Sequence, residues 1–316
     1  MTFWKDKTVL VTGAHGFVGT HVVKMLKEKE GTTVHCPSRY DYNLTIERDV
    51  DLMFKHLRPE VVIHLAGKVG GIAANKSEPG TFFYENIMMG TLVLEYARRY
   101  DVQKTVALAA GCGYPLNLNV PYTENDFWGG LPQEESMGYS MSKKMLIIQS
   151  WTYRAQYGFN SSILLPANLY GPNDNFDLEK SHVVPALIRK FLYAKENNLP
   201  FVEVWGTGNA TREFLYVEDT AKAILDVVEK FDYSGPLNLG TGAETSIREL
   251  VETIVELIKY DGEIIWNTDR PDGQPRRFYC MERFRKHMGY VPDTTLKEGL
   301  QKTIDWYLNS KDKKRL

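Results

Sequence analysis

Short apolar runs rich in β-branched residues alternate with longer amphipathic segments through the first half of the chain. The runs predict strands, and the amphipathic segments predict helices because their apolar positions recur every three or four residues. Strands are predicted over residues 8–12, 32–36, 61–66, 105–109 and 162–166, and helices over residues 17–30, 47–57, 81–100 and 138–157. This alternation is typical of an α/β protein with a doubly wound parallel sheet of the Rossmann type.

The first predicted strand runs into a glycine-rich turn with Gly-x-x-Gly-x-x-Gly spacing, and the first predicted helix follows it. Gly13 permits the tight turn, Gly16 lets backbone N–H groups approach a pyrophosphate, and Gly19 lets the helix pack closely on the sheet. A tight turn without a ligand would have the same spacing, but the strand–turn–helix context favours a dinucleotide site. We expect further cofactor contacts from His15, Phe17, Val18, Leu65, Ala66 and Gly67.

The end of the second predicted strand bears on the choice between NAD and NADP. NAD sites commonly place an acidic residue there to accept the ribose hydroxyls, whereas a basic residue suits the extra phosphate of NADP. The chain has no acidic residue there before Asp41, and it has Arg39. Arg39, together with His15, can pair with the 2′-phosphate, so NADP is favoured. NAD remains an alternative, as does a solvated loop role for Arg39.

After residue 167 the alternation loosens, and helices are predicted over residues 181–197, 219–231 and 246–260, with loops rich in Gly, Pro and Asn between them. A chain of 316 residues is long enough for two lobes. We expect a dinucleotide-binding domain over residues 1–167, joined by parts of 213–240, and a smaller α/β substrate lobe over residues 168–316.

Charge and cysteine content limit the classes of partner. The formal net charge of -2 gives no overall field that would attract nucleic acid or an anionic membrane. The 3 cysteines are too few and too widely spaced for a disulfide framework or a clustered metal site. No apolar stretch approaches the length of a membrane span or a signal-peptide core. We therefore expect a cytoplasmic protein that binds a small ligand, with no metal, nucleic-acid or membrane partner.

Tyr139 and Lys143 lie four residues apart on one face of the predicted helix over residues 138–157. The ammonium of Lys143 would stabilise the phenolate of Tyr139 and lower its pKa, so that Tyr139 can exchange a proton with a substrate hydroxyl or ketone near neutral pH. A Tyr-x-x-x-Lys pair also occurs as a solvated surface pair. Behind a glycine-rich strand turn, it favours a catalytic role.

These features and several later segments resemble the extended short-chain dehydrogenase/reductase family, and within it the branch that acts on GDP-4-keto-6-deoxymannose. The resemblance runs over nearly the whole chain. It is carried by the segments 67–75 (GKVGGIAAN), 112–115 (CGYP), 139–143 (YSMSK), 168–176 (NLYGPNDNF), 181–187 (SHVVPAL), 204–208 (VWGTG), 212–214 (REF) and 271–276 (PDGQPR). It implies a GDP-sugar substrate, epimerisation at C3 and C5, and NADPH-dependent reduction at C4.

The resemblance also implies roles for individual residues. Cys112 and His182 would move the protons at C3 and C5 beside the 4-keto group, since a thiol and an imidazole both titrate close to neutrality. Without the resemblance, Cys112 is equally explained as a small buried residue and His182 as a polar or helix-capping residue. Contacts to the nucleotide-sugar are implied for Asn168, His182, Val183, Lys190, Trp205 and Arg212. The helices over residues 81–100 and 138–157 imply a homodimer, in which Met88, Leu92, Ile148 and Trp151 serve either the interface or the core.

One position departs from the family pattern. Most relatives carry Ser or Thr four residues before the tyrosine that corresponds to Tyr114, and its hydroxyl hydrogen-bonds the reacting oxygen, whereas this chain has Ala110. Losing one such donor typically slows a reaction on the order of 10²-fold or more.

Three interpretations remain open because of Ala110. The first is epimerisation and/or C4 reduction with a compensating donor. The second is an altered enzyme, either a GDP-sugar C4 dehydrogenase or an epimerase that does not reduce. The third is a nucleotide-binding protein without catalysis. Retention of the four candidate catalytic residues, Cys112, Tyr139, Lys143 and His182, favours an enzyme.

Overall fold

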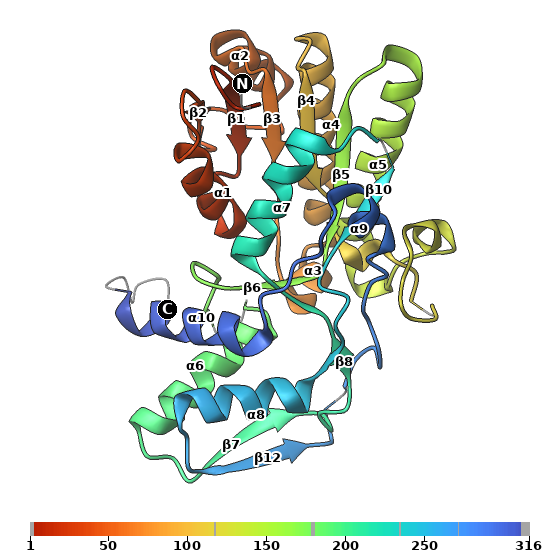
Figure 1. Cartoon of the computed structure of the whole chain (residues 1–316). Coiled ribbons are helices and arrows are strands. Elements are labelled where there is room, and N and C mark those ends of the chain that lie inside the picture. Colours follow the sequence, from red (N-terminus) through yellow and green to blue (C-terminus); the bar gives the residue numbers. More distant parts are fainter. Residues whose placement is uncertain (1–2, 117, 178–180, 234, 271, 311–316) are drawn as a thin grey trace.

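The structure is a computed structural model that describes residues 3–116, 118–177, 181–233, 235–270 and 272–310. Pro271, which opens one of the sequence segments named above, lies outside the described residues. Figure 1 shows a larger unit built on a central sheet and a smaller unit below it. Within the described ranges, no helix is both long and apolar enough to cross a membrane.

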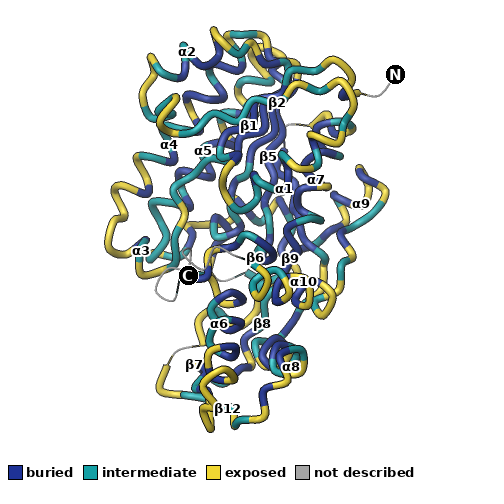
Figure 2. Tube along the Cα trace, turned by 90° about the vertical axis from the view of Figure 1, so that its left-hand side faces the viewer, coloured by how far each residue is buried: buried dark blue, intermediate teal, exposed yellow. Residues whose placement is uncertain are grey.

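The larger unit contains a six-stranded parallel sheet with the strand order β10-β5-β4-β3-β1-β2. Its strands are β1 (Thr8–Thr12), β2 (Thr33–His35), β3 (Val61–His64), β4 (Lys104–Leu108), β5 (Ser161–Pro166) and β10 (Pro236–Leu239). The central strands are almost completely buried, as the dark strands in Figure 2 show, because helices cover both faces of the sheet. The strand order reverses between β1 and β3, and open α/β sheets bind ligands outside the carboxyl ends of the strands at such a point.

Helices cover the sheet in two layers (Figures 1 and 2). On one face, α1 (Phe17–Lys27) packs against α7 (Val217–Lys230). The other face carries α2 (Glu47–Leu57), α4 (Pro79–Arg99) and α5 (Met137–Tyr157), and the short helix α3 (Ile72–Ser77) precedes α4. Three 3₁₀ helices, η1 (Gly111–Gly113), η2 (Glu124–Trp128) and η3 (Glu134–Ser136), connect β4 to α5.

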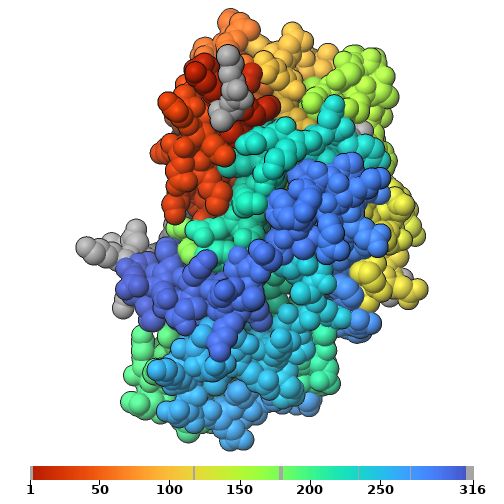
Figure 3. All heavy atoms as spheres, in the orientation of Figure 1, coloured from red at the N-terminus to blue at the C-terminus, as the bar shows by residue number. Residues whose placement is uncertain are grey.

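The smaller unit has a hydrophobic core of its own. Its strands form the parallel pairs β6 (Asn168–Tyr170) with β9 (Phe214–Tyr216) and β7 (Phe201–Trp205) with β12 (Glu263–Asn267), and the antiparallel pair β8 (Thr211–Arg212) with β11 (Thr245–Ser246). Its helices are α6 (Val183–Glu196), α8 (Ile247–Ile258) and α10 (Leu296–Asn309), whereas α9 (Glu282–Met288) packs against β10 and α7 of the larger unit. Figure 3 shows the C-terminal part of the chain, in blue, extending over both units.

The predicted Rossmann-type parallel sheet is confirmed. The elements β1 and α2 have the predicted bounds, and the other predicted strands and helices differ at their ends by a few residues. Residues 213–240 contribute α7 and the sixth strand, β10, to the larger unit. The sequence pattern did not reveal α9, α10 or the pairing of β7 with β12, whose residues lie far apart along the chain. The domain boundary at residue 167 stays a prediction.

Gly19 allows α1 to approach the glycine-rich turn. An added Cβ there would lie 2.1 Å from the carbonyl oxygen of Gly13 and 2.8 Å from the Cα of Ala14. We expect Gly19→Ala to lower the free energy of unfolding by about 1–3 kcal/mol, the usual cost of overpacking, as measured by urea unfolding. Gly71→Ala is the matched control, since an added Cβ there meets nothing within 4 Å. Equal losses in the two variants would contradict this account.

Candidate active site

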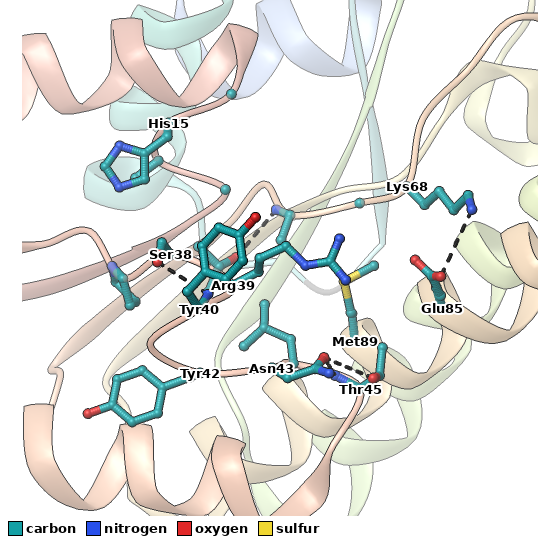
Figure 4. A pocket seen from close by; sticks show the side chains of 18 of the residues that line it. His15, Ser38, Arg39, Tyr40, Tyr42, Asn43, Thr45, Lys68, Glu85 and Met89 are labelled. Carbon is teal, nitrogen blue, oxygen red and sulfur yellow. Dashed lines mark hydrogen bonds and ion pairs between the residues drawn. The ribbon is translucent and has the colours of Figure 1, made fainter.

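A cleft of about 880 Å³ opens at the carboxyl ends of β1 and β3 (Figure 4). This volume is within the usual range for small-molecule sites. Six of the predicted cofactor residues line the cleft: Gly13, His15, Gly16, Arg39, Ala66 and Gly67. Four others belong to α1 or to the segment after β3 and are not among the described residues that line it: Phe17, Val18, Gly19 and Leu65.

The glycine-rich turn fits a bound dinucleotide. Gly13 has a φ of +69°, and an added Cβ would lie 2.7 Å from the amide nitrogen of Ala66, so only glycine is accommodated. Helix α1 begins at Phe17 directly after Gly16 on the cleft wall, and no side chain of the described residues caps it. Its first N–H groups therefore lack side-chain partners and suit a phosphate.

The loop after β2 forms another wall of the cleft. Arg39 and Tyr40 are exposed there, and Figure 4 shows both side chains over the cleft. Asp41 faces Ser38 instead: its Oδ2 accepts hydrogen bonds from the Oγ and the backbone nitrogen of Ser38, both at 2.7 Å. These bonds lower the pKa of Asp41 and hold the loop, so Arg39 is the charged side chain that this loop offers to a ligand.

Tyr139 and Lys143 lie in the first two turns of α5, with the Lys143 nitrogen 5.9 Å from the centroid of the Tyr139 ring. Lys143 is 5% exposed, and its Nζ donates to the carbonyl oxygen of Leu108 at 3.3 Å. The same Nζ would lie 3.2 Å from a Cβ added to Gly67, so it reaches the wall of the cofactor cleft.

Burial controls the protonation of this pair. It lowers the pKa of Lys143 to about 8. It raises the pKa of Tyr139, and the neighbouring Cys112 adds to the rise. The lowering predicted for Tyr139 is therefore wrong for this structure, because desolvation of the phenolate outweighs the ammonium at this separation.

Cys112 lies in η1, directly after β4 and beside α5. Ser140 of α5 donates a hydrogen bond from its Oγ to the Cys112 sulfur at 3.1 Å. Burial raises the pKa of the thiol, and the guanidinium of Arg277 opposes part of that rise. Cys112 and Arg277 also line a small cavity, together with Tyr122 and Gln274. The structure thus brings Cys112 together with the catalytic pair of α5.

His182 is the residue before α6, and its side chain is exposed, although the surrounding protein partly desolvates the ring and lowers its pKa. Among the described residues no hydrogen bond joins His182 to Cys112, whose sulfur accepts from Ser140, and the acid/base pair stays a prediction.

The remaining predicted substrate residues belong to the smaller unit. Asn168, Lys190 and Arg212 each donate to backbone carbonyl oxygens, which fixes their side chains. Trp205 is 61% exposed and Val183 is 38% exposed. The guanidinium of Arg270 lies 5.0 Å from the centroid of the Trp205 ring, and the exposed ring suits packing against a nucleotide base.

Ser140 and Arg277 were not predicted as site residues from the sequence. Ser140 directly follows Tyr139, and only the packing of α5 on η1 shows that its hydroxyl meets Cys112. Arg277 is the second of two consecutive arginines. Arg276 forms an ion pair with Glu244, whereas Arg277 faces the cavity beside Cys112. The sequence contains no signal that distinguishes the two arginines.

Residues 9–240 match the family described as the NAD dependent epimerase/dehydratase family. The chain belongs to this family. It is 36% identical to GDP-L-fucose synthase 1 of Arabidopsis thaliana over 306 residues, which cover 97% of this chain and 94% of that protein. A GDP-L-fucose synthetase of Naegleria fowleri bound to NADP has a TM-score of 0.91 at 27% identity, covering 100% of this chain and 97% of that one. The GDP-mannoheptose C4 reductase of Campylobacter jejuni with NADP bound has a TM-score of 0.90 at 27% identity, covering 98% and 100% of the two chains.

Membership of the epimerase/dehydratase family confirms the predicted resemblance and makes the chain an enzyme that uses a nicotinamide cofactor. The cleft at the glycine-rich turn has the position, size and helix end that such a dinucleotide needs.

Burial of Lys143 predicts a specific pH dependence of stability. Its pKa falls from 10.5 to about 8, so the folded protein releases this proton at lower pH than the unfolded chain does. Between these two values the unfolded chain binds more protons, and the free energy of unfolding therefore rises with pH. We expect Lys143→Met to remove up to about 3 kcal/mol of that rise, as measured by urea unfolding in steps across this pH range.

Lys104 accounts for part of the rise that remains in this variant, because burial also lowers its pKa to about 8. Parallel pH curves for the unaltered protein and the variant would contradict the prediction.

Proposed function

We propose that the substrate is a GDP-linked 4-keto-hexose, such as a 6-deoxyhexose, or a related sugar. The protein epimerises this sugar at C3 and C5 and reduces it at C4 with NADPH. The observation that carries this proposal is the placement of Cys112, Tyr139 and Lys143 around the end of β4, beside a dinucleotide cleft. The names of the relatives, which include GDP-L-fucose synthases and a GDP-heptose reductase, support the substrate class.

Epimerisation uses the acidity of protons next to a ketone. When such a proton leaves, the negative charge is shared with the C4 oxygen, and inversion needs a base on one face and an acid on the other. The raised pKa of Cys112 keeps its thiol protonated at neutral pH, and the lowered pKa of His182 keeps its imidazole neutral. One group can therefore give a proton while the other takes one, with the sugar bound between them.

Reduction at C4 requires a proton for the carbonyl oxygen. The bound nicotinamide supplies the hydride. Tyr139, held protonated by its raised pKa, gives its proton to the oxygen. Lys143 is an ammonium below its pKa of about 8 and stabilises the phenolate that remains. Arg212 and Lys190 would meet the diphosphate, and Trp205 the base.

We propose NADP as the cofactor, with NAD as the alternative. The only acidic side chain of the loop after β2, Asp41, is engaged by Ser38, and Arg39 is exposed at the cleft. The His15 ring lies in the same wall, with its Nε2 3.0 Å from the carbonyl oxygen of Cys36. This wall suits a 2′-phosphate better than a pair of ribose hydroxyls.

We expect Arg39→Ala to weaken NADPH binding by about 10- to 100-fold, the usual value of charge-assisted hydrogen bonds, and to change NADH binding little. Fluorescence titration with each cofactor measures both affinities. Arg58→Ala removes another exposed arginine, one that does not line the cleft, and serves as the control. Equal losses for NADPH and NADH would contradict recognition of the 2′-phosphate by Arg39.

Incubation with GDP-4-keto-6-deoxymannose and NADPH in D₂O tests the reaction. We expect deuterium at C3 and C5 and oxidation of NADPH. Cys112→Ser should slow the exchange and Tyr139→Phe should slow NADPH oxidation, each by about 10²- to 10⁴-fold, the usual range for loss of a general acid or base. Cys280→Ser changes another half-buried cysteine and should leave both rates unchanged.

Because Ala110 lacks the usual hydroxyl, the same experiment also distinguishes the alternative functions. Exchange without NADPH oxidation would identify an epimerase that does not reduce. Absence of both would overturn the proposal in favour of a GDP-sugar C4 dehydrogenase, which would reduce NADP with the 4-hydroxy sugar, or of a protein that binds nucleotides without catalysis.

We also propose a homodimer through α4 and α5, in the cytoplasm, without nucleic-acid or membrane partners. Ile148 on α5 is exposed and available to a second copy, whereas Leu92 on α4 is buried within the chain and serves the core.

A further inference from the structure

Arg277 is a half-buried cation that lacks a carboxylate partner among the described residues. Its neighbour Arg276, by contrast, lies 2.6 Å from Glu244. Arg277 lines the small cavity beside Cys112. Burying a guanidinium without a counter-charge is costly unless a bound group supplies negative charge. The guanidinium is therefore placed to donate to an anionic or electron-rich group of a ligand.

The side chain of Tyr279 lies beside this guanidinium. Burial lowers the pKa of Arg277, but the neighbouring Tyr279 and Cys112 more than offset that effect, so the pKa is raised. Both occupy the space beside Gly111, where an added Cβ would lie 1.6 Å from the Tyr279 Oη and 2.9 Å from an Arg277 Nη2. Gly111 does not have a positive φ, so glycine is needed here for space and not for its backbone conformation.

Tyr279 is itself rigidly mounted. Its backbone nitrogen donates to Oε2 of Glu213 at 2.8 Å, and its ring lies 5.5 Å from the ring of Tyr114. It is 3% exposed, and its hydroxyl donates to the carbonyl oxygen of Pro166 at 3.4 Å. Such support from residues around the site is what keeps a catalytic donor in its productive geometry.

We propose that Arg277 donates a hydrogen bond to the C4 oxygen of the sugar, in place of the hydroxyl that the chain lacks at Ala110, and that Tyr279 is its positioning residue. This inference rests on the proposed function. Arg277 lies beside Gly111, the residue after Ala110, and lines the same small cavity as Cys112. Arg277 stays protonated throughout, because the proton that the C4 oxygen gains comes from Tyr139.

The C4 oxygen becomes negative in both reactions. It gains charge when a proton leaves C3 or C5, and again when C4 is reduced. A donor at this oxygen therefore accelerates both steps, whereas Cys112 serves only the first and Tyr139 only the second. This shared dependence is the signature of the proposed role.

The diphosphate of the substrate is the other group that Arg277 can bind, because Arg277 lies near Arg212, the proposed diphosphate contact. The pKa of Arg212 is lowered by burial and, in addition, by the charge of Arg277. The two roles differ in their kinetics. A diphosphate is equally charged in the ground state and the transition state, so removal of a residue that contacts it raises KM. Charge on the C4 oxygen develops only during reaction, so loss of its donor lowers kcat. The location of Arg277 beside Cys112 favours the second role.

The experiment compares Arg277→Met, Tyr279→Phe and the control Arg276→Met, with GDP-4-keto-6-deoxymannose as substrate. Deuterium exchange at C3 and C5 is measured with NADP present, and NADPH oxidation is measured separately. We expect Arg277→Met to lower kcat of both reactions by about 10²-fold or more with little change in KM. Tyr279→Phe keeps the ring, removes the oxygen beside the guanidinium and should lower both values of kcat by about tenfold. Arg276→Met should behave as the unaltered protein.

Thermal unfolding and NADPH binding of each variant show whether the fold and the cofactor site are intact. A higher KM with unchanged kcat for Arg277→Met would overturn the inference in favour of a diphosphate contact. A fall in only one of the two rates would also overturn it. Unchanged kcat values in Tyr279→Phe would overturn the positioning role of Tyr279. If the unaltered protein shows neither rate, it is the proposed function that fails, and this inference fails with it.

Discussion

The carboxylate of Glu213 holds together the segments that meet at the active site. Its side chain is buried, and it accepts hydrogen bonds from the backbone nitrogens of Thr241 at 2.5 Å, Gly242 at 2.7 Å and Tyr279 at 2.8 Å. Burial raises the pKa of Glu213, and these hydrogen bonds oppose the rise. Gly240 leaves room for the carboxylate, since an added Cβ would lie 2.1 Å from Oε1. Glu213, directly before β9, therefore joins the loop after β10 to the segment around Tyr279 in one rigid junction.

Each group at the site is fixed by the element that carries it. The end of β4 and the first turns of α5 supply Cys112, Tyr139 and Lys143, and the junction at Glu213 supplies Arg277. The chain as a whole carries a net charge of only -2, so recognition of an anionic ligand depends on local cations and on the uncapped start of α1. Binding of a nucleotide-sugar therefore depends on charges inside the site and not on the net charge of the outer surface.

The sequence predicted those features that depend on neighbours along the chain. Five of the six strands of the sheet, the glycine-rich turn and the spacing of Tyr139 and Lys143 are local patterns, and the structure contains them. Features that depend on distant packing were not predictable. Strand β7 pairs with β12 some sixty residues further on, and Tyr139 has a raised pKa because of burial that no local pattern encodes. Arg277 lies near Cys112 in a segment that also pairs with the distant Tyr122 through Tyr279.

The lack of space at Gly111 couples this position to Tyr279 through simple exclusion. A larger side chain at position 111 cannot coexist with the phenol, and removing the phenol first leaves an unfilled space in a tightly packed aromatic group. Either change alone is unfavourable, so the two positions are expected to change together or not at all as sequences diverge. Gly111 thereby places an energetic barrier between the present packing and any packing with a larger side chain at position 111.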